Sequence, residues 1–345
     1  MFIKTLGTSF IGSSSVSQLS NYFFKRKPLV VLYHGVTKEN DFHGIENYRG
    51  KHVSAEAFEK QISWLSKYFT IVPLKEIERL IGQNKKLNKP LCAITFDDGY
   101  RNNFLNAYPI LKKYNVPATI FLTTGFIEKK IALWPDILEH AISHLKAQEL
   151  TLHFPEGEQT YTTRTRKDKL TADMDIRNRL KKVSSDKRES VLGEIQNIAQ
   201  TDLKQVLSYS DYAPLSWNEI REMKENGLIT FGAHTDTHPI LSQESEEFQR
   251  EEIRLSVDML RSTIGDCEHF AYPNGQGGDW NGTTKRILRE LHILYAWTTE
   301  GRRVNMADDN RLELPRVTLD ATENFNRFRA LASLLPTVRS LIHHG

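Results

Sequence analysis

Short apolar runs that alternate with helical patterns constrain the fold of this 345-residue chain more than any other feature. The runs lie at residues 29–35, 91–96, 118–124, 228–234, 269–273, 293–299 and 314–319. Repeated strand–helix alternation predicts parallel strands with helices outside them. We therefore expect an α/β fold, a distorted (β/α)7-8 barrel rather than an open doubly wound sheet. No glycine-rich dinucleotide-binding fingerprint follows any of the runs.

Residues 128–212 interrupt this alternation, because they are rich in charged and hydroxyl side chains and carry little strand pattern. We expect a charged, mostly helical insertion between two barrel strands. Its charge is most simply a solvated face, and contact with an anionic glycan or a membrane surface is the alternative. The expected order is an N-terminal leader (1–27), the first part of the barrel (28–127), the insertion (128–212), the second part of the barrel (213–335) and a C-terminal tail (336–345).

Composition excludes several classes of protein. The net charge of +3 does not indicate a nucleic-acid partner, because such proteins carry a clustered basic face. Two cysteines are too few for a disulfide framework, and no apolar stretch is long enough to span a membrane. The leader lacks the continuous apolar run of a secretory signal, and its "YFFKRK" segment is compatible with peripheral membrane contact. We expect a cytoplasmic or membrane-peripheral protein, whose oligomeric state the sequence does not indicate.

Polar side chains collect at the carboxyl ends of the expected strands. They are His34, Asp97, Asp98, His234, His238, Tyr272 and Asn274. The loops that follow parallel strands converge at this edge, and it holds the active site in β/α folds. We therefore expect these residues to share one site.

The segment "HTDTH" places His234 and His238 four residues apart, on one face if the segment makes a helical turn. That spacing suits two imidazoles on one divalent ion. Thr235 stands where a metalloprotease motif has its glutamate, so a carboxylate must come from elsewhere. Asp98, at a neighbouring strand end, completes a two-histidine, one-carboxylate set that leaves a coordination position for water. Zinc is the expected ion, and cobalt, nickel and iron suit the same ligands.

The adjacent carboxylates Asp97 and Asp98 need compensation, because like charges so close do not both ionise cheaply. A cation bound by Asp98 supplies it, which leaves Asp97 to act as a general base. The alternative, a turn that merely ends a strand, fits "DDG" alone but does not explain the histidine pair.

"TFDDG" at 95–99, "HTDTH" at 234–238 and "FAYPNG" at 270–275 have the order and setting of motifs in the polysaccharide deacetylases, carbohydrate esterase family 4, whose shared segment is the NodB homology domain. "VVLYHGV" at 30–36 and "LSWNEIREM" at 215–223 also resemble this family. The resemblance covers about residues 28–320 apart from the insertion.

The resemblance implies a distorted β/α barrel that uses a divalent metal to remove N-acetyl, or sometimes O-acetyl, groups from sugars. It implies that Asp97 is the base and that Asp98, His234 and His238 are the metal ligands. Water activated by the metal attacks the acetyl carbonyl, and the backbone N–H of Asn274 is an oxyanion donor.

Two features depart from the family pattern. The third motif usually carries an arginine that orients the base, and here "AY" replaces it; Arg316 is the candidate that reaches Asp97 instead, with a structural arginine as the alternative.

The usual late "LxH" histidine, the general acid, is matched only by "LIHH" at 341–344, beyond the last barrel element. His34 is a better candidate for a second catalytic or substrate-contacting histidine, with a buried strand histidine as the alternative. Tyr272 and Trp297 are candidates to line the sugar or acetyl pocket, and an ordinary core tryptophan is equally consistent with Trp297.

The leading hypothesis is a metal-dependent hydrolase that removes N-acetyl groups from the amino sugars of a polysaccharide or glycoconjugate. Within the same chemistry, the alternative is deacetylation or deformylation of a lipid-linked amino sugar. A different class of protein, an inactive barrel that binds glycans, would have lost the base or a metal ligand. This chain retains Asp97, Asp98, His234 and His238. The expected partner is thus a carbohydrate or glycolipid.

Overall fold

The computed structural model describes residues 27–38, 42, 44–83, 87, 89–319 and 324–333. The expectations for the leader before residue 27 and for the "LIHH" tail lie outside these residues. No helix in the described part of the chain combines the length and the apolar character needed to cross a membrane.

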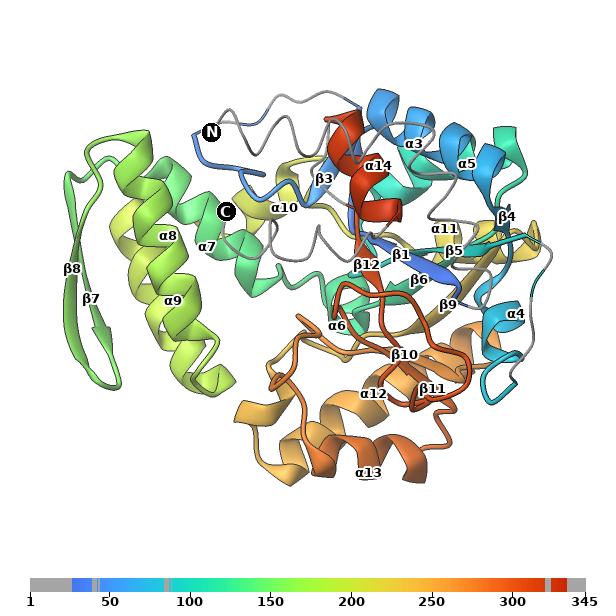
Figure 1. Cartoon of the computed structure of the whole chain (residues 1–345). Coiled ribbons are helices and arrows are strands. Elements are labelled where there is room, and N and C mark those ends of the chain that lie inside the picture. Colours follow the sequence, from blue (N-terminus) through green and yellow to red (C-terminus); the bar gives the residue numbers. More distant parts are fainter. Residues whose placement is uncertain are drawn as a thin grey trace.

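The centre of the fold is an eight-stranded, all-parallel sheet, in the order β11-β10-β9-β6-β5-β1-β12, with β4 paired to the start of β5 (Figure 1). Its strands are β1 (Leu29–Tyr33), β4 (Thr70–Ile71), β5 (Leu91–Phe96), β6 (Ala118–Leu122), β9 (Ile229–Ala233), β10 (His269–Ala271), β11 (Tyr295–Trp297) and β12 (Val317–Thr318). Most of these strands are buried on both faces, as expected of near-continuous apolar runs between layers of side chains.

The two ends of this sheet meet through one short segment. Leu314 forms a parallel bridge with Trp297 of β11, and three residues later Val317 pairs with Val31 of β1. The predicted distorted barrel is therefore confirmed. The strand expected over 314–319 is shorter than predicted, because Pro315 has no N–H to donate to a ladder.

Helices surround the sheet (Figure 1), and several of them have ordinary capping residues at their ends. Ser54 caps the first turn of α3, Ser216 forms a capping box with Glu219, and Gly265 ends α12 with φ 94°. The helices of this layer are α3 (Ala55–Tyr68), α4 (Leu74–Glu78), α5 (Tyr108–Tyr114, preceded by a π turn at Asn103–Ala107), α6 (Thr124–Glu128), α11 (Trp217–Glu225), α12 (Glu246–Ile264), α13 (Gly282–Glu290) and α14 (Phe325–Ser333).

Residues 128–212 contain helices α7 (Trp134–His144), α8 (Arg166–Leu180), α9 (Ser185–Ala199) and α10 (Leu203–Ser208), and the antiparallel hairpin β7 (Glu149–Phe154) and β8 (Gly157–Thr162). The hairpin lies at the far side of this segment in Figure 1. Strand β8 was not predicted, because its "GEQTYT" sequence is largely exposed and has no apolar run. The helices share an apolar cluster with Tyr100 and Phe126, from the loops and helix that follow β5 and β6, so the segment packs against the carboxyl edge of the barrel.

A second, two-stranded parallel sheet also lies beside this edge. It pairs β2 (Gly35–Thr37) with β3 (His52–Ser54). The turns between these strands, at residues 44–49, face helix α7, since the backbone N–H of Ile45 donates to the Ser143 hydroxyl at 3.0 Å. The loop after β1 is thereby held against the insertion, an arrangement that the apolar pattern did not predict.

Candidate active site

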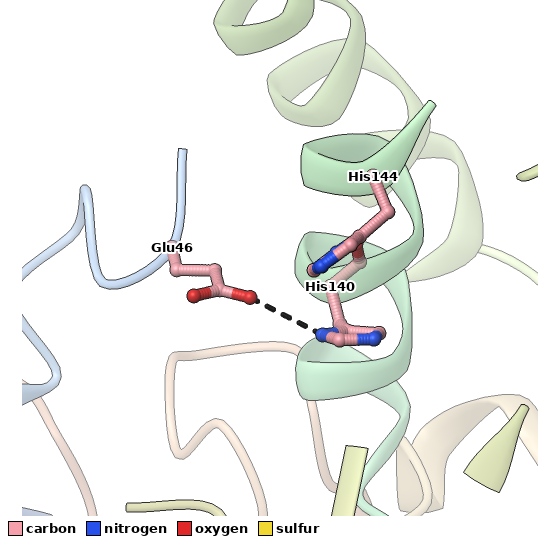
Figure 2. Close-up of side chains that lie close together, drawn as sticks. All are labelled: Glu46, His140 and His144. Atoms are coloured by element: carbon pink, nitrogen blue, oxygen red, sulfur yellow. Dashed lines mark hydrogen bonds and ion pairs between the residues drawn. The ribbon is translucent and has the colours of Figure 1, made fainter. Parts of the chain in front are cut away.

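Two groups of described residues have metal-ligand chemistry, and the first lies in the insertion (Figure 2). His140 and His144 stand one turn apart on α7, and Nδ1 of His140 is 3.2 Å from Oε1 of Glu46. Nδ1 of His144 donates to the carbonyl of His140 at 2.9 Å, and the Tyr209 hydroxyl is 3.3 Å from its Nε2. Protein groups engage three of the four ring nitrogens, and only the buried Nε2 of His140 has no hydrogen-bond partner among the described residues. The sequence analysis did not single it out.

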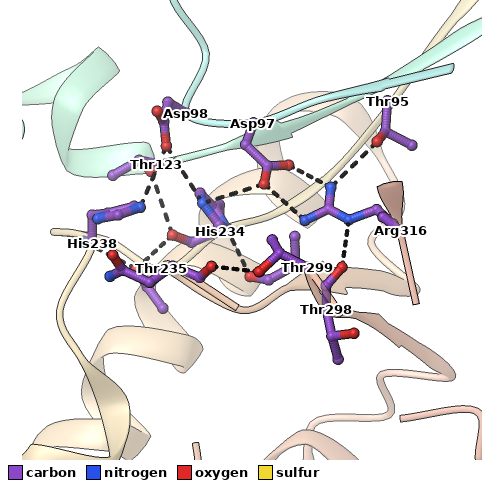
Figure 3. A network of polar contacts seen from close by, with 12 residues as sticks. Thr95, Asp97, Asp98, Thr123, His234, Thr235, His238, Thr298, Thr299 and Arg316 are labelled. Atoms are coloured by element: carbon purple, nitrogen blue, oxygen red, sulfur yellow. Dashed lines mark hydrogen bonds and ion pairs between the residues drawn. The ribbon is translucent and has the colours of Figure 1, made fainter. Parts of the chain in front are cut away.

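The second group, Asp98, His234 and His238, lies where β5 and β9 end (Figure 3). Oδ1 of Asp98 is 3.4 Å from Nε2 of each histidine. Ligand atoms bound tetrahedrally at zinc distances lie roughly 3.4 Å apart, so both separations fit such an ion. All three ligand atoms lie within 4.8 Å of one another. This oxygen is buried and accepts no hydrogen bond of normal geometry from the described residues, a costly state for a carboxylate unless a cation satisfies it.

Both histidines direct Nε2 to that point. Nδ1 of His234 donates to the Ala271 carbonyl at 2.7 Å, a contact that orients the ring with Nε2 towards Asp98. Burial lowers the pKa of His238 to about 3, so its ring is neutral at pH 7. Metal binding requires unprotonated imidazoles, and burial of His238 favours this form.

The "HTDTH" segment is not the helical turn that the sequence suggested. Thr235 and His238 have φ of 67° and 64°, and a β-branched residue rarely adopts this conformation. The strain is offset locally, since the Thr235 hydroxyl accepts the His238 N–H at 3.0 Å. Glu252 of α12 accepts the N–H groups of Asp236 and Thr237 at 3.0 and 2.8 Å. A loop held from both sides, rather than helical spacing, brings the two rings together.

Asp97 is held by Arg316, which the sequence offered only as a candidate. The guanidinium donates to both carboxylate oxygens of Asp97, at 2.7 and 2.8 Å, and to the Thr298 carbonyl at 3.2 Å. Arg316 is completely buried. Burial by itself raises the pKa of Asp97, but the charge and hydrogen bonds of Arg316, together with the nearby histidines, outweigh it, and the pKa lies below its ordinary value. Asp97 is therefore an oriented, ionised carboxylate beside the candidate metal ligands (Figure 3).

Replacement of Arg316 by Gln is expected to move the acid limb of the kcat/KM–pH profile to higher pH. A general base must be deprotonated, so activity falls as pH drops through its pKa. Loss of the arginine leaves burial to dominate, and the shift is expected to be about 1–3 pH units. Arg303→Gln removes another buried guanidinium, one that donates to the Ala332 carbonyl, and should leave the limb in place. An unmoved limb in Arg316→Gln would show that this arginine does not control Asp97.

A cavity of about 310 Å³ opens over these residues. His34 and Asn274 line it, as expected for residues at strand ends. Asn274 has φ 58°, and its loop is fixed by Thr299, whose hydroxyl donates to the Asn274 carbonyl at 2.9 Å. At Gly275, with φ 69°, an added Cβ would lie 2.9 Å from the Thr299 side chain, so the tight turn requires glycine. The loop thus has a defined shape beside Asp97.

Tyr272 and Trp297 do not line the cavity, so their expected contact with substrate is wrong for this structure. The Tyr272 hydroxyl donates to the Leu312 carbonyl at 2.8 Å, and its ring stacks on Trp280 with centroids 4.4 Å apart. Trp297 is fully buried in an apolar cluster with Phe121 and Ala271. Side chains alternate between the two faces of a strand, and this alternation places both rings in packing layers rather than at the edge.

The insertion supplies a wall of the cavity that the sequence analysis did not identify. Its lining residues are Leu133, Pro135, Glu139, Arg177 and Lys181, joined by Arg49 and Lys51 from the loop before β3. No local motif marks these residues. They reach the cavity only because α7 and α8 pack against the strand-end loops.

Comparison with known proteins agrees with this geometry. The family model described as polysaccharide deacetylase matches residues 84–185 and 191–296. The poly-beta-1,6-N-acetyl-D-glucosamine N-deacetylase of Staphylococcus epidermidis is 26% identical over 267 residues, which cover 71% of this chain and 85% of that protein. YxkH of Bacillus subtilis is 36% identical over 123 residues, 32% of this chain, and the match spans only 44% of YxkH.

Among solved structures, the deacetylase PplD of Streptococcus pyogenes in complex with acetate has a TM-score of 0.56 and 20% identity, over 87% of this chain and 96% of PplD, and shares its fold. The residues matched by the family include Asp97, Asp98, His234 and His238, whereas Arg316 lies beyond them. More than half of the chain is matched, and the chain therefore belongs to the polysaccharide deacetylase family.

Proposed function

We propose that this protein is a metal-dependent N-deacetylase that hydrolyses the acetamido group of an amino sugar in a glycan or glycoconjugate. The observation that carries the proposal is the pairing of Asp97 with Arg316 next to the convergent nitrogens and oxygen of His234, His238 and Asp98. Amide hydrolysis by water requires a general base and, beside it, a group of metal ligands of which that base is not a member.

Asp98, His234 and His238 would hold the ion. A divalent metal there supplies a lowered pKa for water and polarisation of the acyl carbonyl. Zinc is the ion proposed, because the donors are two imidazoles and one carboxylate; cobalt, nickel and iron bind the same set.

The chain's own residues perform the proton transfers. Asp97 accepts a proton from the attacking water while Arg316 holds its two oxygens in place. The backbone N–H of Asn274 is proposed to donate to the carbonyl oxygen as negative charge develops on it. As the C–N bond breaks, the leaving nitrogen needs a proton, and His34 is the proposed donor, since it is the histidine in the cavity wall outside the metal set.

The substrate class follows from the family and the cavity. The Staphylococcus epidermidis relative is named for a β-1,6-linked N-acetylglucosamine polymer. The volume of about 310 Å³ is at the small end for a ligand pocket, which suits one sugar residue rather than a long chain segment.

The test is acyl release by purified protein loaded with zinc, cobalt, nickel or iron, with a chelated sample as the control. Substrates are β-1,6-linked N-acetylglucosamine oligomers, chitooligosaccharides, peptidoglycan and lipid-linked amino sugars. Acetate released from an amino sugar only when metal is present is the expected result. Formate released from a formylated lipid-linked sugar would instead identify a deformylase. Release of neither acid with any metal would overturn the proposal.

A further inference from the structure

The wall that faces the metal set carries more positive charge than the protein itself neutralises. Four cationic side chains line the cavity on this side: Arg49, Lys51, Arg177 and Lys181. We infer that Arg49 and Lys181 bind an anionic group of the substrate, a phosphate or a carboxylate carried on or next to the sugar that is deacylated. This inference rests on the proposed function and adds the substrate's charge to it.

Lys51 and Arg177 already have buried partners. Lys51 forms an ion pair with Asp136. Arg177 donates to both oxygens of Asp173, at 3.1 and 3.0 Å, and lies 3.8 Å from Glu139. These carboxylates come from α7 and α8, so the two cations are neutralised from behind and remain part of the cavity wall.

Arg49 and Lys181 are different. Neither side chain makes a hydrogen bond or an ion pair with any residue in the described ranges. Arg49 is exposed and Lys181 is half-buried. Burial lowers the pKa of Lys181; the charge of Asp279 opposes this effect, and the charges of Arg49 and Arg177 lower the pKa further. Three cations thus lie near one another with two of them unpaired.

The remaining carboxylates of the cavity do not compensate for this charge. Asp97 is paired with Arg316, Asp98 faces the metal position, and Glu139 lies between Lys51 and Arg177. Unpaired like charges in a partly desolvated pocket are unfavourable unless an anion joins them. Guanidinium and ammonium groups form their strongest hydrogen bonds with phosphate and carboxylate oxygens.

The position of the pair restricts where the anion lies on the substrate. Arg49 comes from the loop before β3 and Lys181 from the end of α8, and both line the same small cavity as Asp97 and the metal set. The anion is therefore carried by the reacting sugar or by its immediate neighbour, not by a distant part of the glycan.

The test compares binding of matched sugars to the zinc-loaded Asp97→Asn protein, so that turnover does not interfere. The probes are N-acetylglucosamine, its 1-phosphate and N-acetylmuramic acid, which differ in carrying no anion, a phosphate or a carboxylate. Calorimetry is expected to give at least about tenfold tighter binding for one anionic probe than for the neutral sugar, and that probe identifies which anion is used.

The Arg49→Gln/Lys181→Gln double substitution in the same background is expected to bring the ratio of the two affinities close to one. Lys182→Gln is the matched control, because it removes a neighbouring, exposed charge that does not line the cavity, and the ratio should persist. Equal affinities for anionic and neutral sugars, or a ratio that survives the double substitution, would overturn the inference. Because this readout is binding, its outcome is separate from whether acetate release supports the proposed function.

Discussion

Asp97→Asn is expected to reduce kcat for acetate release by about 10²–10⁴-fold, the usual contribution of a general base. The amide cannot accept the proton from water, whereas Asp98, His234 and His238 are untouched. Metal content, measured by elemental analysis of the purified protein, should therefore equal that of the unsubstituted chain.

The same substitution leaves the buried Arg316 without its carboxylate partner, so a loss of stability is also expected, of about 3–5 kcal/mol if no water compensates. Thermal unfolding separates this effect from catalysis, because activity is compared at a temperature where both proteins are folded. Asp175→Asn on α8 is the control, since Asp175 binds Tyr161 and Arg179 away from the cavity. Acetate release by Asp97→Asn at the unsubstituted rate would remove Asp97 from the role of base.

His238→Ala is expected to lose both the metal and the activity. It removes Nε2 of His238, which lies 3.4 Å from Oδ1 of Asp98, and metal affinity should fall by more than about 100-fold, because even outer-shell partners change it by about 10–100-fold. Metal stoichiometry after dialysis is the measurement, and acetate release should fall to the level of the chelated protein.

The chain offers a matched control for this result. His144→Ala removes a histidine from the other group with ligand chemistry, beside His140 and Glu46. If the strand-end group is the metal site, His144→Ala keeps its metal and His238→Ala does not. The opposite pattern would place the ion in the insertion and would contradict the assignment of the site.

The parallel barrel was predictable because its strands are buried on both faces and read as continuous apolar runs. β5 coincides with its predicted range of 91–96. Hairpin strand β8 was missed because an exposed strand has no apolar signature. This missed strand lies outside the barrel core.

The convergence of Asp98, His234 and His238 was predictable because these residues follow predicted strands of one parallel sheet, whose carboxyl ends share an edge. Their geometry was not, since the positive φ of Thr235 and His238 depends on contacts with α12 and with the Thr235 hydroxyl. Tyr272 and Trp297 were misplaced for a related reason: at a strand end, one residue of difference moves a side chain from the cavity to a packing layer.

By itself, the sequence determined the class of fold and the residues proposed as base and metal ligands, because both follow from local patterns of polarity. Only the tertiary structure decided that Arg316, 219 residues from Asp97, holds this carboxylate, and that the loop before β3 and the insertion bring Arg49 and Lys181 to the same cavity. The physical reason is that an ion pair or a cavity wall depends on distance in space, which residues remote in the chain acquire only through packing.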